Sequence, residues 1–113
     1  MSNIYPKHFK QSEIYGLRDR LILMLDQARE IAGVPFIITS GLRTADQNRA
    51  VGGVSDSAHL KGLAVDLQCK NSNTRFKIVK SLLEVGFNRI EIAPLHIHTD
   101  IDNLKPKEVI FFK

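Results

Sequence analysis

The chain has one cysteine, no tryptophan and no long apolar run. A single cysteine, Cys69, cannot form an intramolecular disulfide, so stability must come from packing or from a bound metal. No stretch approaches the roughly 20 apolar residues that a membrane-spanning helix needs, so membrane insertion is not expected. The N-terminus carries no apolar segment behind a basic start, which predicts synthesis in the cytoplasm without a secretory signal peptide.

The chain also lacks blocks of like charge. Sixteen Lys and Arg stand against 12 Asp and Glu, which gives a net charge of +4 scattered over 113 residues. A weakly basic surface attracts polyanions, but without any basic-aromatic motif it does not predict a nucleic-acid partner. With 43% hydrophobic and 25% charged residues, the composition is that of an ordinary globular domain. The length allows only one, so residues 1–113 are predicted to form a single domain, which we expect to be a monomer.

Helical periodicity predicts helices over 12–32 and 74–85, and a capping box that begins at Thr44 predicts a short helix through Ala50. Short β-rich runs lie at 36–39, 62–67, 88–92, 95–101 and 109–112. The last three runs follow one another closely, which favours antiparallel pairing over a doubly wound parallel sheet. We therefore predict an α+β fold, with a small antiparallel sheet and helices packed on one side.

The segment HIHTDID at 96–102 alternates between polar and apolar residues. Because side chains of a strand alternate between faces, its polar residues share one face: His96, His98, Asp100 and Asp102. Asp66 lies in another, otherwise apolar run, where a buried carboxylate needs a cation or a metal. Imidazole and carboxylate ligands suit Zn²⁺ but also Fe(II), so the residue types leave the metal open. A solvent-exposed polar face is the simpler alternative.

Three ordered motifs resemble those of a known family. They are SGLR at 40–43, SAHLKGLAVD at 57–66 and HIH at 96–98. They are similar to the S-G-x-R, S-x-H-x-x-G-x-A-x-D and H-x-H signatures of the zinc D-alanyl-D-alanine carboxypeptidases. That family includes phage L-alanyl-D-glutamate endolysins and, more distantly, the Hedgehog domain. The intervening QNRAVGG at 47–53 also resembles the family's link, and the likeness spans 36–102.

The resemblance implies a Hedgehog-like zinc peptidase fold and one Zn²⁺ held by His59, Asp66 and His98. In such a site the ion lowers the pKa of its water and polarises the peptide carbonyl. The implied substrate is the peptide stem of bacterial peptidoglycan, cut at the terminal D-Ala–D-Ala bond or at the L-Ala–D-Glu bond. Without a signal peptide, the chain is expected to be a phage or prophage product that reaches the cell wall through lysis or in a virion.

The resemblance also implies roles around the metal. Arg43 would hold a substrate carboxylate or polarise the scissile carbonyl, and Ser57 would contact the substrate or a ligand. Relatives with a glutamate base place it three residues before the last histidine, where this chain has Leu95. His96 is therefore the first candidate for the general base, and Asp100 is the weaker one. The alternative is a non-catalytic zinc-binding module on the same scaffold, which would not need His96 or Arg43.

Overall fold

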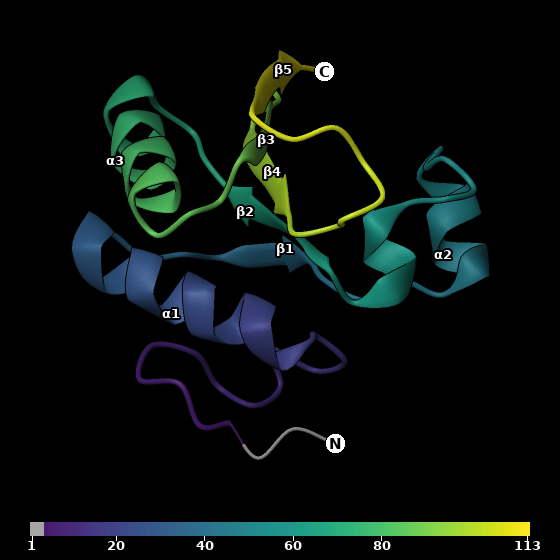
Figure 1. Cartoon of the computed structure of the whole chain (residues 1–113), viewed down its shortest axis with the longest axis horizontal. Coiled ribbons are helices and arrows are strands. Elements are labelled where there is room, and N and C mark those ends of the chain that lie inside the picture. The colour runs from purple at the N-terminus through teal and green to yellow at the C-terminus, as the bar shows by residue number, and fades with distance from the viewer. Residues whose placement is uncertain (1–3) are drawn as a thin grey trace.

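The computed structural model describes residues 4–113 and shows three α-helices, a short 3₁₀ helix and a five-stranded sheet (Figure 1). The helices are α1 Asp19–Ala32, α2 Ala45–Ala50, η1 Ala58–Lys61 and α3 Ser72–Glu84. The strands are β1 Ile38–Ser40, β2 Ala64–Gln68, β3 Arg89–Ile92, β4 His96–Asp100 and β5 Val109–Phe112. None of the helices in this part of the chain is long and apolar enough to cross a bilayer.

The predicted α+β class is confirmed. The strand order is β1-β2-β4-β3-β5, and every pair is antiparallel except β3 and β5, which are parallel. The sheet is therefore mixed, because the long connection after β4 carries the chain back to the outer side of β3. The strand spacing alone predicted a simple antiparallel meander, since it does not show on which side of the sheet the last strand joins.

Helices α1 and α3 pack against each other and cover one face of the sheet (Figure 1). The core between them and the sheet is built from apolar side chains of both layers: Leu21, Ile22, Leu25, Ile78, Leu82, Val65, Leu67, Ile90 and Ile97. Since successive side chains of a strand alternate, the residues between these apolar positions point to the opposite face. That second face carries the polar residues of β2 and β4.

Helix α1 begins only at Asp19, later than the periodicity over 12–32 predicted. The preceding segment forms turns, and Gly16 has a φ of 76°, a left-handed conformation that ends any helix. Ile14 and Leu17 are nevertheless buried in the core. The apolar residues in this segment therefore indicate positions buried in the core, and they do not indicate a helix.

The short helix α2 follows its sequence signal closely. The Thr44 side chain accepts a hydrogen bond from the Gln47 backbone N–H, and the Gln47 side chain accepts one from the Thr44 backbone. This reciprocal pair satisfies two amide donors that an uncapped helix start would leave without partners. The capping box therefore fixes where the chain turns after β1, and with it the position of Arg43, which directly precedes the cap.

Candidate metal centre

The register of β2 and β4 brings two of the three predicted ligands, Asp66 and His98, together. Asp66 is paired with His98 across the antiparallel ladder. Directly paired residues point to the same face, so their side chains are neighbours. The Nδ1 atom of His98 lies 3.0 Å from Oδ1 of Asp66. Both side chains lie on the face of the sheet away from α1 and α3.

His59 reaches the same carboxylate from η1. Ser57 caps this short helix, and its hydroxyl accepts the His59 backbone N–H at 3.2 Å. The His59 ring is buried, with Nδ1 2.8 Å from the carbonyl oxygen of Gly41 and Nε2 3.2 Å from Oδ1 of Asp66. A carbonyl oxygen can only accept, so Nδ1 carries a proton and donates it. The Gly41 carbonyl therefore fixes the ring in the orientation that presents Nε2 to Asp66.

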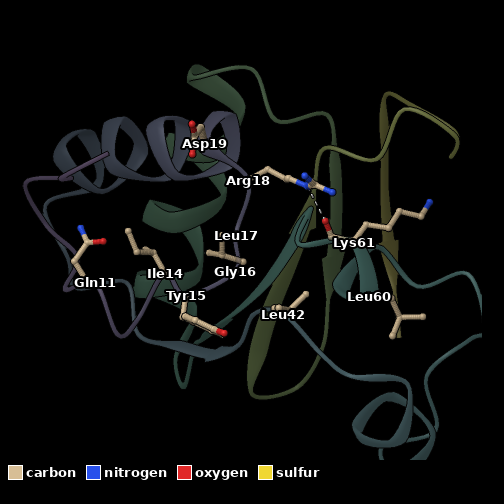
Figure 2. A pocket seen from close by; sticks show the side chains of 10 residues that line it. All are labelled: Gln11, Ile14, Tyr15, Gly16, Leu17, Arg18, Asp19, Leu42, Leu60 and Lys61. Carbon is tan, nitrogen blue, oxygen red and sulfur yellow. Dashed lines mark hydrogen bonds between the residues drawn. The ribbon is translucent and has the colours of Figure 1, made fainter. Parts of the chain in front are cut away.

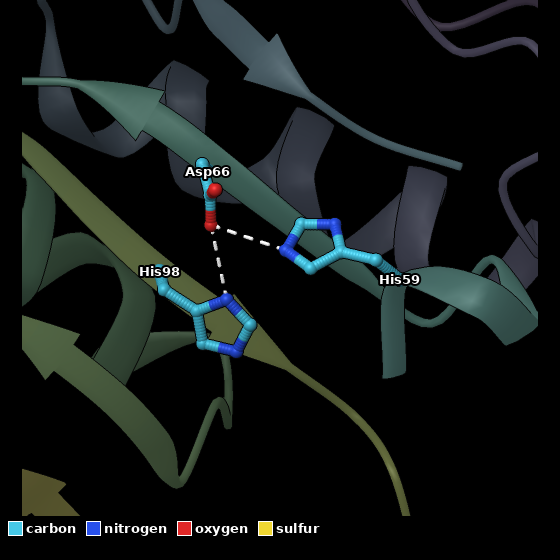
Figure 3. Close-up of side chains that lie close together, drawn as sticks. All are labelled: His59, Asp66 and His98. Carbon is cyan, nitrogen blue, oxygen red and sulfur yellow. Dashed lines mark hydrogen bonds and ion pairs between the residues drawn. The ribbon is translucent and has the colours of Figure 1, made fainter. Parts of the chain in front are cut away.

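Three donor atoms thus converge from three different elements: Nε2 of His59, Oδ1 of Asp66 and Nδ1 of His98 (Figure 3). The ligand atoms of this group lie within 4.8 Å of one another. Two imidazole nitrogens and one carboxylate oxygen form the donor set of a catalytic zinc site, which leaves a fourth position for water or substrate. The residues present therefore fit a zinc ion.

Arg43 binds the carboxylate oxygen of Asp66 that does not face the two histidines. Its Nη2 donates to Oδ2 of Asp66 at 3.2 Å, its Nε to the Ser40 hydroxyl at 2.9 Å, and its Nη1 to Oδ1 of Asn48 at 3.3 Å. These bonds use three of the five N–H donors of the guanidinium, which leaves two. Arg43 can therefore orient Asp66 and still offer donors to a substrate oxygen.

The matching family agrees with this geometry. The sequence model of the M15 peptidases matches residues 8–102 of the chain. The chain belongs to the M15 peptidase family. Peptidases of this family are zinc-dependent. The match confirms the predicted kinship with the zinc D-alanyl-D-alanine carboxypeptidases. No curated protein matches the chain.

In this M15 peptidase the second ring nitrogen of His98 also has a partner. Its Nε2 lies 2.8 Å from Oδ2 of Asp100, whose other oxygen accepts from Nε of Arg89 at 2.9 Å. Burial disfavours the charged imidazole, but the hydrogen bonds to Asp100 and Asp66 outweigh burial and raise the pKa of His98 to about 9. In the metal-free chain His98 is therefore protonated at neutral pH, and binding a metal must release that proton.

The ligand carboxylate shows the opposite shift. Burial would raise the pKa of Asp66, but hydrogen bonds with His59 and His98 hold it well below its usual range. Asp66 is therefore ionised at neutral pH. An ionised carboxylate can bind a metal without first losing a proton.

The two remaining predicted site residues, His96 and Ser57, differ in burial and in their hydrogen bonds. His96 lies two residues before His98 on the same face of β4 and opposite Gln68, half-buried. No hydrogen bond connects its side chain to another residue within 4–113. His96 therefore lies beside the group formed by His59, Asp66 and His98 and is not part of it. Ser57 is buried, and its hydroxyl caps η1 as described above.

One contributor was not singled out from the sequence. Asn48 is 2% exposed, although amides are usually found on surfaces. Its Oδ1 accepts from Arg43, and its Nδ2 donates to the Val54 carbonyl at 2.8 Å. Gly53 lies so close that an added Cβ would approach Oδ1 of Asn48 to 2.0 Å. The QNRAVGG segment was recognised as a link, but its spacing gives no sign that the amide supports Arg43.

A separate hollow of about 870 Å³ opens on another part of the surface (Figure 2). Turns of the N-terminal segment line one side of it, including the exposed Tyr15, and Leu42 and Leu60 line the other. It therefore borders the loops that carry Arg43 and His59. None of the predicted site residues lines it, so the size of a hollow does not mark the metal centre.

Proposed function

We propose that this chain is a zinc-dependent peptidase that hydrolyses the peptide stem of bacterial peptidoglycan. The observation that carries the proposal is the convergence of His59, Asp66 and His98 on one point, with Arg43 bound to the same carboxylate. Membership of a zinc peptidase family supports the metal and a peptide substrate. The three sequence motifs support the stem peptide as the substrate class.

The ligand residues prepare the centre before any ion arrives. The Gly41 carbonyl fixes the ring of His59, and Asp66 is held by Arg43 and by both imidazoles. A zinc ion bound there would supply a water of lowered pKa and polarise the scissile carbonyl. Because donors held in place need not reorganise, the ligand set favours a single geometry.

Arg43 and His96 would act on the substrate itself. The two guanidinium N–H groups that remain on Arg43 would donate to the carbonyl oxygen, or to a carboxylate of the stem, as charge develops there. A ring nitrogen of His96 would accept the proton of the attacking water and then deliver it to the leaving amine. His96 suits this task because it lies beside the ligands and its ring is not engaged by another residue of the described chain.

The non-catalytic zinc module remains the competing function. A structural zinc site is normally closed by four protein ligands, whereas this group offers three and leaves one position open. A structural site also has no use for an arginine with donors to spare. Both features favour the enzyme.

The test is mass spectrometry of defined stem peptides and of sacculi after incubation with the zinc-loaded chain, with and without a chelator. Chelator-sensitive loss of one alanine would identify a D,D-carboxypeptidase. Release of a peptide that begins with D-Glu would identify an L-Ala–D-Glu endopeptidase. Absence of cleavage by a chain shown to hold zinc would contradict the proposal and favour the non-catalytic module. Asp66→Ala is the matched control for contaminating peptidases.

A further inference from the structure

A line of buried charges extends from the metal centre towards the C-terminal strand. His98 contacts Asp100 two residues further along β4, and Asp100 contacts Arg89 at the start of β3. The Asp100 side chain is 1% exposed and that of Arg89 is 10% exposed. Charged groups are rarely buried unless they are paired, so each of these contacts is needed to keep the next charge in the interior.

The two histidines present different ring nitrogens to the centre, Nε2 from His59 and Nδ1 from His98. A neutral imidazole carries one proton, and the nitrogen that binds a metal must be the unprotonated one. For His98 this requires a proton on Nε2, and Nε2 is the atom that faces Oδ2 of Asp100 at 2.8 Å. A carboxylate at that point accepts the Nε2 proton and leaves the Nδ1 lone pair directed to the metal.

Asp100 is itself held from two further directions. One oxygen accepts both Nε of Arg89 at 2.9 Å and the backbone N–H of Asp102 at 3.1 Å. Arg89 is fixed in turn by the segment that follows β4, because it donates to the Pro106 carbonyl and its guanidinium carbon lies 5.5 Å from the centre of the Phe111 ring. The C-terminal segment, from Pro106 to Phe111, is thereby linked to a metal ligand through two side chains.

A second ion pair, in which only the acid is buried, lies close by and provides a comparison. Nζ of Lys61 lies 3.0 Å from Oδ2 of Asp102, whose side chain is 2% exposed. That pair joins η1 to the segment after β4. Within residues 4–113, neither of its side chains makes a hydrogen bond or an ion pair with His59, Asp66 or His98. It resembles the Arg89–Asp100 pair in charge and in the burial of its acid, but it lacks the contact with a ligand.

We infer that Asp100 and Arg89 are positioning residues for the metal centre: Asp100 fixes the tautomer and orientation of His98, and Arg89 fixes Asp100. The inference rests on the proposed zinc site but not on the proposed substrate. It gives a function to the C-terminal segment from Pro106 to Phe111, which lies beyond residues 8–102, the part of the chain that the family model matches. Through Arg89, β5 and the segment before it help to determine how tightly the ion is held.

The test is the zinc dissociation constant, measured by competition with a chromophoric chelator. The double variant Arg89→Met/Asp100→Leu removes both charges together, so no uncompensated charge is left in the interior. We expect it to fold and to bind zinc about 10- to 100-fold more weakly than the unaltered chain, as is usual when the partner of a histidine ligand is lost. Asp100→Asn keeps an acceptor oxygen and should retain most of the affinity.

The matched control is Lys61→Met/Asp102→Leu, which removes the side chains of the second ion pair but keeps the backbone N–H of Asp102 that donates to Asp100. This control should leave zinc affinity unchanged. Long-range proton–nitrogen NMR correlations of zinc-loaded protein provide a readout that stability alone would not alter. His98 should be protonated at Nε2 in the unaltered chain and should lose this uniform state in Arg89→Met/Asp100→Leu. If that double variant fails to fold, Asp100→Asn and Arg89→Lys give the same comparison with smaller losses.

Unchanged zinc affinity in a folded Arg89→Met/Asp100→Leu variant would overturn the inference, as would an equal loss in the Lys61→Met/Asp102→Leu control. Either result would leave the proposed function intact. In a third outcome, the unaltered chain binds zinc without cleaving any stem peptide, while Arg89→Met/Asp100→Leu binds zinc more weakly. That combination would refute the proposed function and support the inference. A chain that binds no zinc at all would refute both.

Discussion

The two faces of β2 and β4 differ completely in chemistry although their residues alternate along the same strands. Val65, Leu67 and Ile97 face α1 and α3 and are fully buried in the core. Their chain neighbours Asp66 and His98 face the other way and form the metal centre. Because the side-chain period is two, a slip of one residue would exchange core and site. The same alternation therefore specifies both the fold and the chemistry.

The two faces also differ in what their residues need. An apolar side chain of the core needs only volume and burial, so many neighbours can stabilise it. A ligand on the polar face needs one atom in one place, and each ligand here has a dedicated partner for its remaining polar atom: the Gly41 carbonyl for His59, Arg43 for Asp66, and Asp100 for His98. Substitutions on the two faces should therefore have separable effects.

The largest effect is expected from the centre of the polar face. Asp66→Ala removes the carboxylate that both imidazoles and Arg43 contact, so zinc binding and peptide hydrolysis should both fall below detection. Elemental analysis of the purified protein and a stem-peptide assay check this result. Zinc bound at full stoichiometry to Asp66→Ala would show that the ion is held elsewhere.

His96→Ala tests the same face beside the ligands. Hydrolysis is expected to fall by about 10²- to 10⁴-fold, the usual loss when a general base is removed, with zinc content unchanged. Steady-state kinetics and zinc analysis of one preparation separate the two effects. If zinc were lost together with activity, His96 would be a ligand and the assignment of the ligand set would be wrong.

Ile97→Ala tests the opposite face of β4, at the position between His96 and His98. Its side chain is 0% exposed, so its truncation should lower the free energy of unfolding by about 2–5 kcal/mol. Urea unfolding measures the loss. Under conditions in which the variant remains folded, its zinc affinity should match that of the unaltered chain. A variant with full stability but weakened zinc binding would contradict the division between the two faces.

An effect no larger than that of Ile97→Ala is expected in the pH dependence of the stability of the metal-free chain. The folded state raises the pKa of His98 from 6.5 to about 9. The protonated imidazole therefore stabilises the fold fully below its ordinary pKa, and this contribution is lost as the pH rises through about 9. The free energy of unfolding of metal-free protein should fall over this range, and His98→Gln should lack that decline. A flat profile for the unaltered chain would contradict the shift.

The strand alternation over 96–102 put His98 on a polar face, and the apolar surroundings of Asp66 indicated a carboxylate in need of a cation. The full ligand set of His59, Asp66 and His98 was implied by the resemblance of three motifs to those of the zinc carboxypeptidases. The supports of the ligands were harder to foresee. Arg89 reaches Asp100 only through the pairing of β3 with β4, and Asn48 reaches Arg43 only because the following loop folds back. Such contacts are tertiary and leave no periodic signal.

For the fold, the sequence predicted most helices and strands but not the order of the strands in the sheet. Burial, capping and strand propensity placed most elements within a few residues, because each of these signals is local. The start of α1 was misplaced because Ile14 and Leu17 are buried without being helical. The parallel pairing of β5 was missed because strand order is decided by the path of the 101–108 connection, whose sequence shows only that it is a loop.

The most direct test of the metal centre is anomalous X-ray scattering at the zinc edge from crystals of the zinc-loaded chain. The account predicts one strong peak within bonding distance of Nε2 of His59, Oδ1 of Asp66 and Nδ1 of His98. Nε2 of His98 should remain hydrogen-bonded to Asp100. A zinc peak elsewhere on the molecule, or one bound through Nε2 of His98, would contradict the account.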